Sequence, residues 1–167
     1  MNLTLTRRGD YSLRAALHLA EAWDRAGYVK IRDVASAMAL PRSYTPQVLG
    51  LLARGGIAEA KAGPGGGYRL AKAPEEISIL DVVQAAEGEL RSTTCILRGG
   101  PCRWEAACAA HEFWARASDV FIETLARSSL RDLMTEDARL AVADGEPGRR
   151  DRRTAGRLGS GARAPRP

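Results

Sequence analysis

The sequence predicts a mainly α-helical protein with one small β-hairpin: a winged helix-turn-helix domain followed by a long dimerisation helix. Three observations lead to this class. Short amphipathic segments follow one another in the first part of the chain, a glycine-rich run at 62–67 separates two short strand-like segments, and segment 104–127 has a broad apolar face. The 167 residues, 45% of them apolar, are enough for one domain with a hydrophobic core.

The charge is divided unevenly along the chain. Segment 1–73 has 11 Lys and Arg against 5 Asp and Glu, segment 74–144 has 7 against 13, and segment 145–167 has 7 Arg against 2 acidic residues. A basic half joined to an acidic half indicates a polyanion-binding part and a part with another role. No run approaches the roughly 18 apolar residues that a membrane span needs. We therefore expect a cytoplasmic protein with no membrane partner and with reduced cysteines.

Helical periodicity in the first half predicts three helices. The first covers 9–26 with Trp23 on its apolar stripe, the second covers 31–38, and the third covers 43–54. Pro46 fits the third helix only within its first turn, and Gly55 and Gly56 supply a left-handed stop.

The remaining elements follow from turn and capping signals. Strands are expected at 57–61 and 68–70, on either side of the glycine run, and a fourth helix from Ser78, capped with Asp81, to Gly88. A loop at 89–103 precedes the long helix 104–127, and Ser129 begins one or two further helical turns. These elements divide the chain into a DNA-binding domain (1–73), a linking helix with a cysteine loop (74–103), a dimerisation region (104–144) and a disordered Arg-rich tail (145–167) that adds nonspecific phosphate affinity or has no role.

The order of helix, tight turn, helix and glycine-tipped hairpin predicts binding to double-stranded DNA, with the third helix entering the major groove by its N-terminal end. The alternative is an ordinary helical hairpin whose polar end is solvated. A nucleotide-binding phosphate loop is excluded, because no Gly-Lys-Ser/Thr follows the glycines. The side chains expected to contact DNA are those of Arg42, Ser43, Tyr44, Thr45, Gln47 and Lys61, together with the backbone N–H groups of Gly65 and Gly66.

Several motifs carry a resemblance to a known family. They are Leu3-Thr4 with Asp10-Tyr11, Ser43-Tyr44 with Gln47, Gly63-Pro64-Gly65-Gly66-Gly67-Tyr68, and the region with three cysteines. Over residues 1–134 the sequence resembles the Rrf-two family of bacterial winged-helix regulators, which includes IscR-like and NsrR-like members. The resemblance implies a homodimer on a near-palindromic operator, with Ser43, Tyr44 and Gln47 at groove-contacting positions. Relatives often have a basic residue directly before the glycine motif, where this chain has Ala62, with Lys61 one position earlier.

The three cysteines follow the pattern Cys95-x6-Cys102-x5-Cys108, which lacks the paired short spacing of a zinc knuckle. Three soft thiolates on a loop suit an iron-sulfur cluster, either 2Fe-2S or 4Fe-4S, and leave one iron position to fill. His111 lies three residues after Cys108, on the same side of the expected helix, and matches the histidine ligand of IscR-like members. Asp10 is the alternative fourth ligand, because it matches a carboxylate that reaches across the dimer in NsrR-like members. Asp10 could instead act as an N-cap near the start of the first helix.

Together these features predict a transcriptional regulator that depends on an iron-sulfur cluster, with repression as its expected action, and that senses nitric oxide, redox state or iron-sulfur status. One alternative is a cluster-free regulator of the same fold that uses thiols or zinc. A remote alternative is an enzyme using Cys108 with His111. No third residue to orient such a pair is evident, so we expect no catalytic residues.

Overall fold

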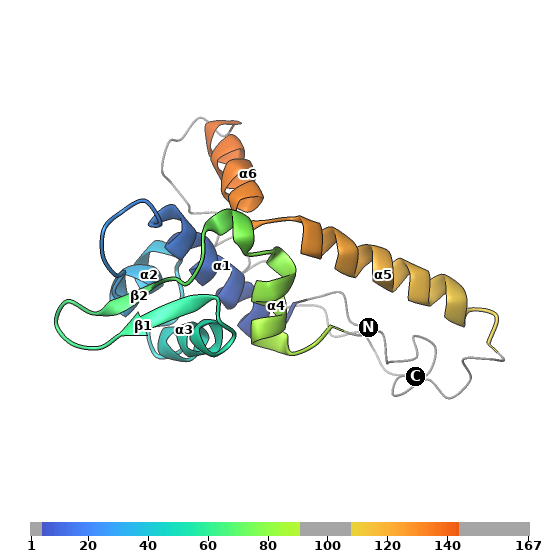
Figure 1. Ribbon diagram of the computed structural model, residues 1–167, viewed down its shortest axis with the longest axis horizontal. Coiled ribbons are helices and arrows are strands. Elements are labelled where there is room, and N and C mark those ends of the chain that lie inside the picture. The colour runs from blue at the N-terminus through green and yellow to red at the C-terminus, as the bar shows by residue number, and fades with distance from the viewer. Residues whose placement is uncertain (1–4, 91–107, 144–167) are drawn as a thin grey trace, which may run out of the picture.

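The computed structural model describes residues 5–90 and 108–143, and it confirms a mainly helical fold with one hairpin. Figure 1 shows the hairpin at one end of the molecule and the long helix α5 extending away from the body at the other. In chain order, the described elements are α1 (Arg7–Glu21), α2 (Ile31–Ala37), α3 (Thr45–Arg54), β1 (Ala58–Lys61), β2 (Gly67–Leu70), the 3-10 turn η1 (Pro74–Glu76), α4 (Ile79–Glu87), α5 (His111–Arg127) and α6 (Leu130–Ala143).

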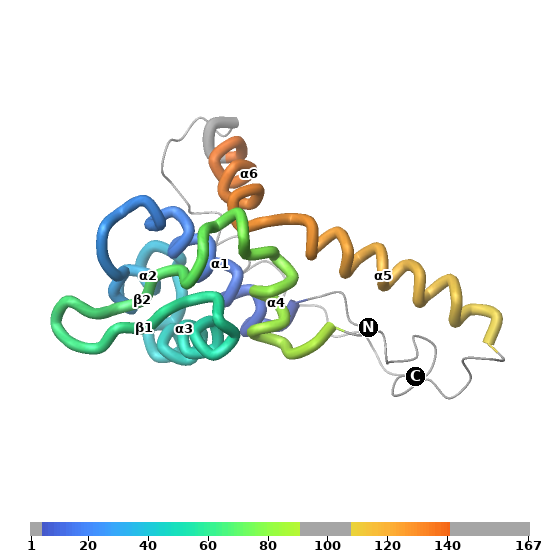
Figure 2. The backbone as a smooth tube through the Cα atoms, in the orientation of Figure 1, coloured from blue at the N-terminus to red at the C-terminus, as the bar shows by residue number. Residues whose placement is uncertain are grey.

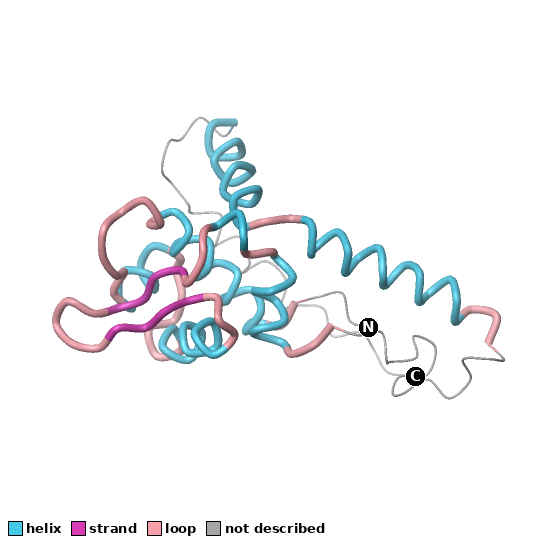
Figure 3. Tube along the Cα trace, in the orientation of Figure 1, coloured by secondary structure: helices cyan, strands magenta, loops and turns pink. Residues whose placement is uncertain are grey.

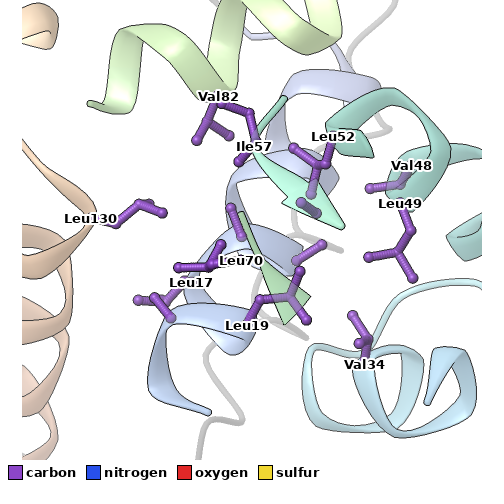
Figure 4. Close-up of a cluster of buried hydrophobic side chains, with 14 of the residues drawn as sticks. Leu17, Leu19, Val34, Val48, Leu49, Leu52, Ile57, Leu70, Val82 and Leu130 are labelled. Atoms are coloured by element: carbon purple, nitrogen blue, oxygen red, sulfur yellow. The ribbon is translucent and has the colours of Figure 1, made fainter. Parts of the chain in front are cut away.

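The hydrophobic core is built around α1. Ala15, Ala16 and Ala20 of this helix are almost completely buried, and such small side chains allow neighbouring elements to approach the helix closely. Helices α2, α3, α4 and α6 and strand β2 all contact α1. Figure 4 shows the larger core side chains converging from these elements: Leu17, Leu19, Val34, Val48, Leu49, Leu52, Ile57, Leu70, Val82 and Leu130.

Helix α1 is shorter than the predicted segment 9–26 and starts earlier. Thr6 is its N-cap, with its hydroxyl oxygen accepting hydrogen bonds from the N–H groups of Arg8 (3.1 Å) and Gly9 (3.5 Å). The helix ends at Glu21, so Trp23 lies outside it and is 37% exposed instead of buried. The periodic pattern of apolar residues continues past Glu21, because the residues of the following turn have the spacing of a helical stripe. Periodicity alone does not show where the backbone leaves the helical conformation.

The turn between α2 and α3 brings the chain sharply around. Ala39 has a left-handed φ of 49°, and the N–H groups of Tyr44 and Thr45 both donate to the Pro41 carbonyl at 2.9 and 3.0 Å. Residues 42–44 therefore form a turn, and α3 begins at Thr45, two residues later than predicted. Pro46 lies in its first turn, as expected.

The two glycines after α3 have different roles, although both were expected to be left-handed. Gly56 has φ 71°, whereas Gly55 has an ordinary φ of −78°. A Cβ atom on Gly55 would lie 2.5 Å from the Cβ of Ala85, so this glycine allows α3 and α4 to approach each other. Only Gly56 supplies the left-handed stop.

The hairpin β1–β2 with its connecting loop 62–66, called the wing from here on, confirms the predicted turn (Figure 3). The strands are antiparallel, with Lys61 opposite Gly67. Val29 extends the pairing, because it exchanges two backbone hydrogen bonds with Tyr68 at 2.8 and 2.9 Å. A Cβ atom on Gly66 would lie 2.0 Å from the Lys61 carbonyl oxygen, and one on Gly67 would lie 2.3 Å from the Val29 oxygen. Larger residues at these two positions are excluded by backbone contact.

The capping box that begins α4 is confirmed. Ser78 accepts a hydrogen bond from the Asp81 N–H at 3.0 Å, while the Asp81 carboxylate accepts one from the Ser78 N–H at 2.9 Å. Gly88, with φ 87°, ends the helix as predicted.

Helix α5 is shorter than predicted, and helix α6 is longer; both helices are drawn in Figure 2. Helix α5 begins at His111, because Cys108 lies before a turn at 109–110; residues 104–107 and the tail 145–167 lie outside the described part. Helix α6 runs from Leu130 to Ala143, far beyond the expected one or two turns. Its start has the expected cap, because the Ser129 hydroxyl oxygen accepts from the Asp132 N–H at 3.1 Å and the Asp132 carboxylate accepts from the Ser129 N–H at 2.8 Å. A tertiary contact adds to this cap, since the side chain of Leu130 is fully buried and its N–H donates to the Ile77 carbonyl at 2.9 Å. Local sequence gives no sign of that contact.

The last residue of α4 satisfies the first turn of α1. Glu87 Oε1 accepts hydrogen bonds from the Thr6 N–H (3.1 Å), the Thr6 hydroxyl (2.6 Å) and the Gly9 N–H (3.0 Å). The first N–H groups of a helix have no partner within the helix, and a carboxylate is favourable beside them. A Cβ atom on Gly9 would lie 2.5 Å from this oxygen, so the contact depends on glycine there. The helix that precedes the cysteines is thereby fastened to the start of α1.

We predict that Glu87→Ala lowers the free energy of unfolding by about 1–3 kcal/mol, because donors at the start of α1 lose a charged acceptor. Urea denaturation of the full chain measures this loss. The matched control is Glu136→Ala, whose carboxylate is paired with Arg139 but whose side chain is 57% exposed, and it should change stability by about 0.5 kcal/mol or less. Equal effects of the two substitutions would contradict the importance of the Glu87 contact.

Candidate DNA-binding surface and cysteine segment

The start of α3 presents polar side chains to solvent. Arg42, Ser43 and Gln47 are exposed, in the turn before the helix and in its first turn. Tyr44 is half-buried, because its ring packs edge-to-face on the Tyr11 ring of α1 with 5.9 Å between centroids. This contact fixes the direction of the turn relative to α1.

Thr45 lies beside these residues but has a different environment. It is completely buried, and its hydroxyl donates to the Pro41 carbonyl at 2.9 Å. The side chain therefore stabilises the turn between α2 and α3 and is not available to a ligand. Sequence reasoning included Thr45 because threonine is a common polar residue at helix starts, and burial is not visible in the sequence.

The wing presents its glycines unequally. Gly65 is exposed, whereas Gly66 is buried and its N–H donates to the Gly63 carbonyl at 3.0 Å. The Gly66 N–H, expected to be exposed, is thus used within the loop, and Gly65 is the better candidate for contact with a ligand.

Two cationic side chains from the strands of the wing lie beside one aromatic ring, that of Tyr28. Lys61 Nζ lies 5.5 Å from the centroid of the Tyr28 ring, and the Arg69 guanidinium lies 5.1 Å from it. Arg69 also forms an ion pair with Glu59 at 2.8 Å, and this hydrogen-bonded partner raises the pKa of Arg69 above its ordinary value. These contacts keep the two cations beside the strands.

A further cation near the wing was missed by the sequence analysis. Lys30, the residue before α2, donates from its ammonium group to the Pro64 carbonyl at the wing tip. Thirty-four positions separate the two residues, so no local pattern connects them. The only available signal was that Lys30 belongs to the basic half of the chain.

Of the three cysteines, the structure describes one. Cys108 is half-buried, and its carbonyl accepts a hydrogen bond from the His111 N–H at 3.0 Å. The expectation that both residues lie on one helix is wrong, because α5 begins at His111. Cys95 and Cys102 lie outside the described residues, and among the described residues alone no group of three or more His, Cys, Asp or Glu could hold a metal ion.

Asp10 has an ion-pair partner in the first turn of α1. Arg14 contacts both of its carboxylate oxygens, with Nε 3.0 Å from Oδ1 and a terminal nitrogen 2.9 Å from Oδ2. Asp10 is not the helix cap, since Thr6 has that role. As a metal ligand, this carboxylate would have to exchange at least part of its contact with Arg14.

Helix α5 has two apolar stripes with different environments. Trp114, Phe121 and Leu125 are half-buried on the side that holds the buried Ser118, and α5 contacts α4. On the neighbouring side, Phe113 is 69% exposed and Val120 is 62% exposed. The Arg116 guanidinium lies 5.3 Å from the centroid of the Phe113 ring, and both apolar side chains are still largely exposed. None of the described helices is both long and apolar enough to cross a membrane.

The helix pair α2–α3 with a polar start to α3, backed by α1 and flanked by a paired hairpin, defines the class of winged helix-turn-helix DNA-binding regulators. The comparison with known families then identifies the group within this class. Residues 5–136 match the model of the Rrf2 family, described as an iron-dependent transcriptional regulator, and the chain belongs to this family.

Similar proteins agree with this assignment. The chain is 31% identical over 142 residues to the HTH-type transcriptional regulator IscR of Pectobacterium carotovorum, with 85% of each chain covered. It is also 31% identical over 141 residues to IscR of Photorhabdus laumondii, covering 84% of this chain and 85% of that one. These relatives are named as transcriptional regulators, which are not enzymes.

Solved structures share the fold. CymR of B. subtilis, described as the global cysteine regulator of that organism, matches with a TM-score of 0.68 and 25% identity over 80% of this chain and 98% of that one. IscR of T. potens matches with a TM-score of 0.62 and 23% identity over 82% of this chain and 90% of that one. The predicted winged-helix fold is confirmed, and regulators of this family bind DNA.

Proposed function

We propose that this Rrf2-family regulator is a cytoplasmic homodimeric repressor that binds a double-stranded DNA operator and is controlled by an iron-sulfur cluster on Cys95, Cys102 and Cys108. The observation that carries the proposal is the position of the cysteines in the chain. They lie between α4, whose last residue Glu87 contacts the start of α1, and α5, which bears an exposed apolar stripe. A change in this segment can therefore affect both the DNA-binding body and the dimer.

DNA recognition is assigned to the start of α3 and to the wing. The exposed Arg42, Ser43 and Gln47, with the hydroxyl end of Tyr44, can donate to or accept from base edges and phosphates in the major groove. Lys61 and the exposed backbone of Gly65 provide contacts from the wing. Thr45 and Gly66 are left out, because their donor groups are used inside the protein.

Gln47→Ala should weaken binding to a specific site by about 5- to 150-fold, the equivalent of a lost bidentate base contact of about 1–3 kcal/mol. Fluorescence anisotropy with a duplex selected from genomic fragments by the unaltered protein measures this. Binding to a random duplex should stay unchanged, because base contacts carry only the specific part.

Gln84→Ala on α4 is the matched control and should leave both affinities unchanged. Equal weakening on the selected and random duplexes by Gln47→Ala would contradict a base contact from this residue.

The exposed stripe of α5 is assigned to the dimer, with a second copy of this chain as its partner. The spacing of Phe113, Ala117 and Val120 places them along one face of α5, where they form an exposed apolar surface. The helix has 17 residues and is roughly 25 Å long. A dimer of the winged domain would bring two α3 helices to successive major grooves.

We expect Val120→Glu to convert the dimer to a monomer, because a carboxylate would be buried at the interface without a partner. Light scattering coupled to size-exclusion chromatography gives the mass. Ala126→Glu, an exposed position on another side of the same helix, should leave the dimer intact. A dimer that persists in Val120→Glu would place the interface elsewhere.

For the cluster, the three cysteine thiolates are the proposed ligands and His111 is the proposed fourth ligand. His111 begins α5 directly after the turn at 109–110, which follows the half-buried Cys108, and the His111 N–H donates to the Cys108 carbonyl at 3.0 Å. Asp10 remains the alternative fourth ligand and would have to give up contacts with Arg14. An iron-sulfur cluster supplies a centre that is sensitive to nitric oxide, oxidation and iron supply.

Protein purified without oxygen should be coloured, with matching iron and acid-labile sulfide, and Cys102→Ala should lose both iron and colour. Operator affinity should change on exposure to nitric oxide or to an iron chelator in the unaltered protein and should not respond in Cys102→Ala. Cluster spectra of His111→Ala and Asp10→Ala, compared with each other, identify the fourth ligand.

Colourless protein with negligible iron after reconstitution would overturn the cluster. Stoichiometric zinc, or DNA affinity that is lost with peroxide, would then favour the zinc- or thiol-based regulator of the same fold.

A further inference from the structure

The tip of the wing has no cationic side chain of its own. The loop 62–66 consists of Ala, Gly, Pro, Gly and Gly. The cations on the flanking strands are Lys61, which lies over the Tyr28 ring, and Arg69, which lies over the same ring and is paired with Glu59. A wing that contacts a polyanion needs positive charge near its tip, and the side chains of these two strand residues both lie over the Tyr28 ring.

Lys30 supplies a cation at the tip from another element. Its ammonium group donates to the Pro64 carbonyl, in the middle of the loop. An ammonium group has three N–H donors, and the Pro64 carbonyl uses one of them. The backbone pairing of Val29 with Tyr68 keeps the residue preceding Lys30 against the hairpin, so the position of Lys30 is fixed by the sheet.

Lys30 lines an open groove of about 700 Å³ between the start of α2 and the wing. The charged residues of this groove are Lys30, Arg32 and Lys61, all of them cationic. Arg32 is 81% exposed, and its nearest acidic partner is Asp33, whose Oδ1 lies 3.4 Å from Nε. Even with Asp33 counted, the groove is positively charged and fits a phosphate group better than a neutral or cationic ligand.

We propose that Lys30 is the phosphate-binding residue of the wing: its ammonium group holds the Pro64 carbonyl and contacts a DNA backbone phosphate in the groove between α2 and the wing. The exposed Arg32 is the second cation of the same groove. The tip of the hairpin extends beyond α2 and α3 in Figure 1. This inference rests on the proposed DNA binding and adds to it a residue far in sequence from the glycine motif.

A phosphate contact has a distinct signature in salt titrations. Each neutralised phosphate adds about 0.9 to the magnitude of the slope of log affinity against log salt concentration, regardless of base sequence. Lys30→Gln should therefore reduce this slope by about 1 and weaken binding about three- to tenfold at low salt, equally on a selected and a random duplex. Lys30→Arg should keep the slope, because the charge is retained.

The matched control is Lys72→Gln, which removes the same charge from an exposed lysine just beyond the end of β2 opposite to the wing tip. It should leave affinity and slope unchanged. The midpoints of thermal unfolding of all variants should be the same, since these are exposed or half-exposed charges.

The outcomes separate the two proposals. If the unaltered protein binds neither duplex, DNA binding itself fails. If the unaltered protein binds but Lys30→Gln keeps its slope, the role of Lys30 is overturned, whether or not affinity falls. The role is also overturned if Lys61→Gln, and not Lys30→Gln, reduces the slope.

Discussion

The burial of α1 is the constraint on which the rest of this structure depends. A helix that contacts three other helices of the body, α6 and a strand needs small side chains where they approach, and Ala15, Ala16 and Ala20 meet this need. Its first turn would leave N–H groups unsatisfied, but Thr6 and the Glu87 carboxylate accept from them. Because Glu87 ends α4, the same contact that completes α1 also fixes the helix leading to the cysteines.

In this arrangement, a short series of contacts connects the end of α4, which precedes the cysteines, to the proposed DNA-binding surface. The side chain of Asp10 lies in the first turn of α1, and Glu87 accepts from that turn one position away, at Gly9. Tyr11, the next residue, packs on Tyr44 in the turn before α3. A displacement of the end of α4 would therefore change the contacts of α1 at Gly9, within one helical turn of Tyr11 and its contact with Tyr44. A difference of about 1.4 kcal/mol between two arrangements changes their ratio tenfold, which is no more than one or two hydrogen bonds of this kind contribute.

The proposed DNA surface is assembled from three separate parts of the chain. The turn and first residues of α3 provide polar groups for bases, the glycine loop provides a narrow backbone tip, and Lys30 before α2 provides charge. Two backbone hydrogen bonds between Val29 and Tyr68 join the last two parts. Basic residues exceed acidic ones in the first 73 positions of the sequence, 11 against 5, but it is the sheet that places Lys30 at the wing.

The sequence by itself determined the kinds of elements and most of their order, because periodicity, capping pairs such as Ser78 with Asp81 and the glycine turn are local signals. It also indicated the family and the exposed polar start of α3. The end of α1, the full length of α6, the burial of Thr45 and the contact of Lys30 with Pro64 were decided only by the tertiary structure. Two of these features depend on a partner distant in the sequence, Ile77 for Leu130 and Pro64 for Lys30. The free energies of burial and of hydrogen bonding come from contacts between two residues. A local sequence pattern contains only one residue of each such pair.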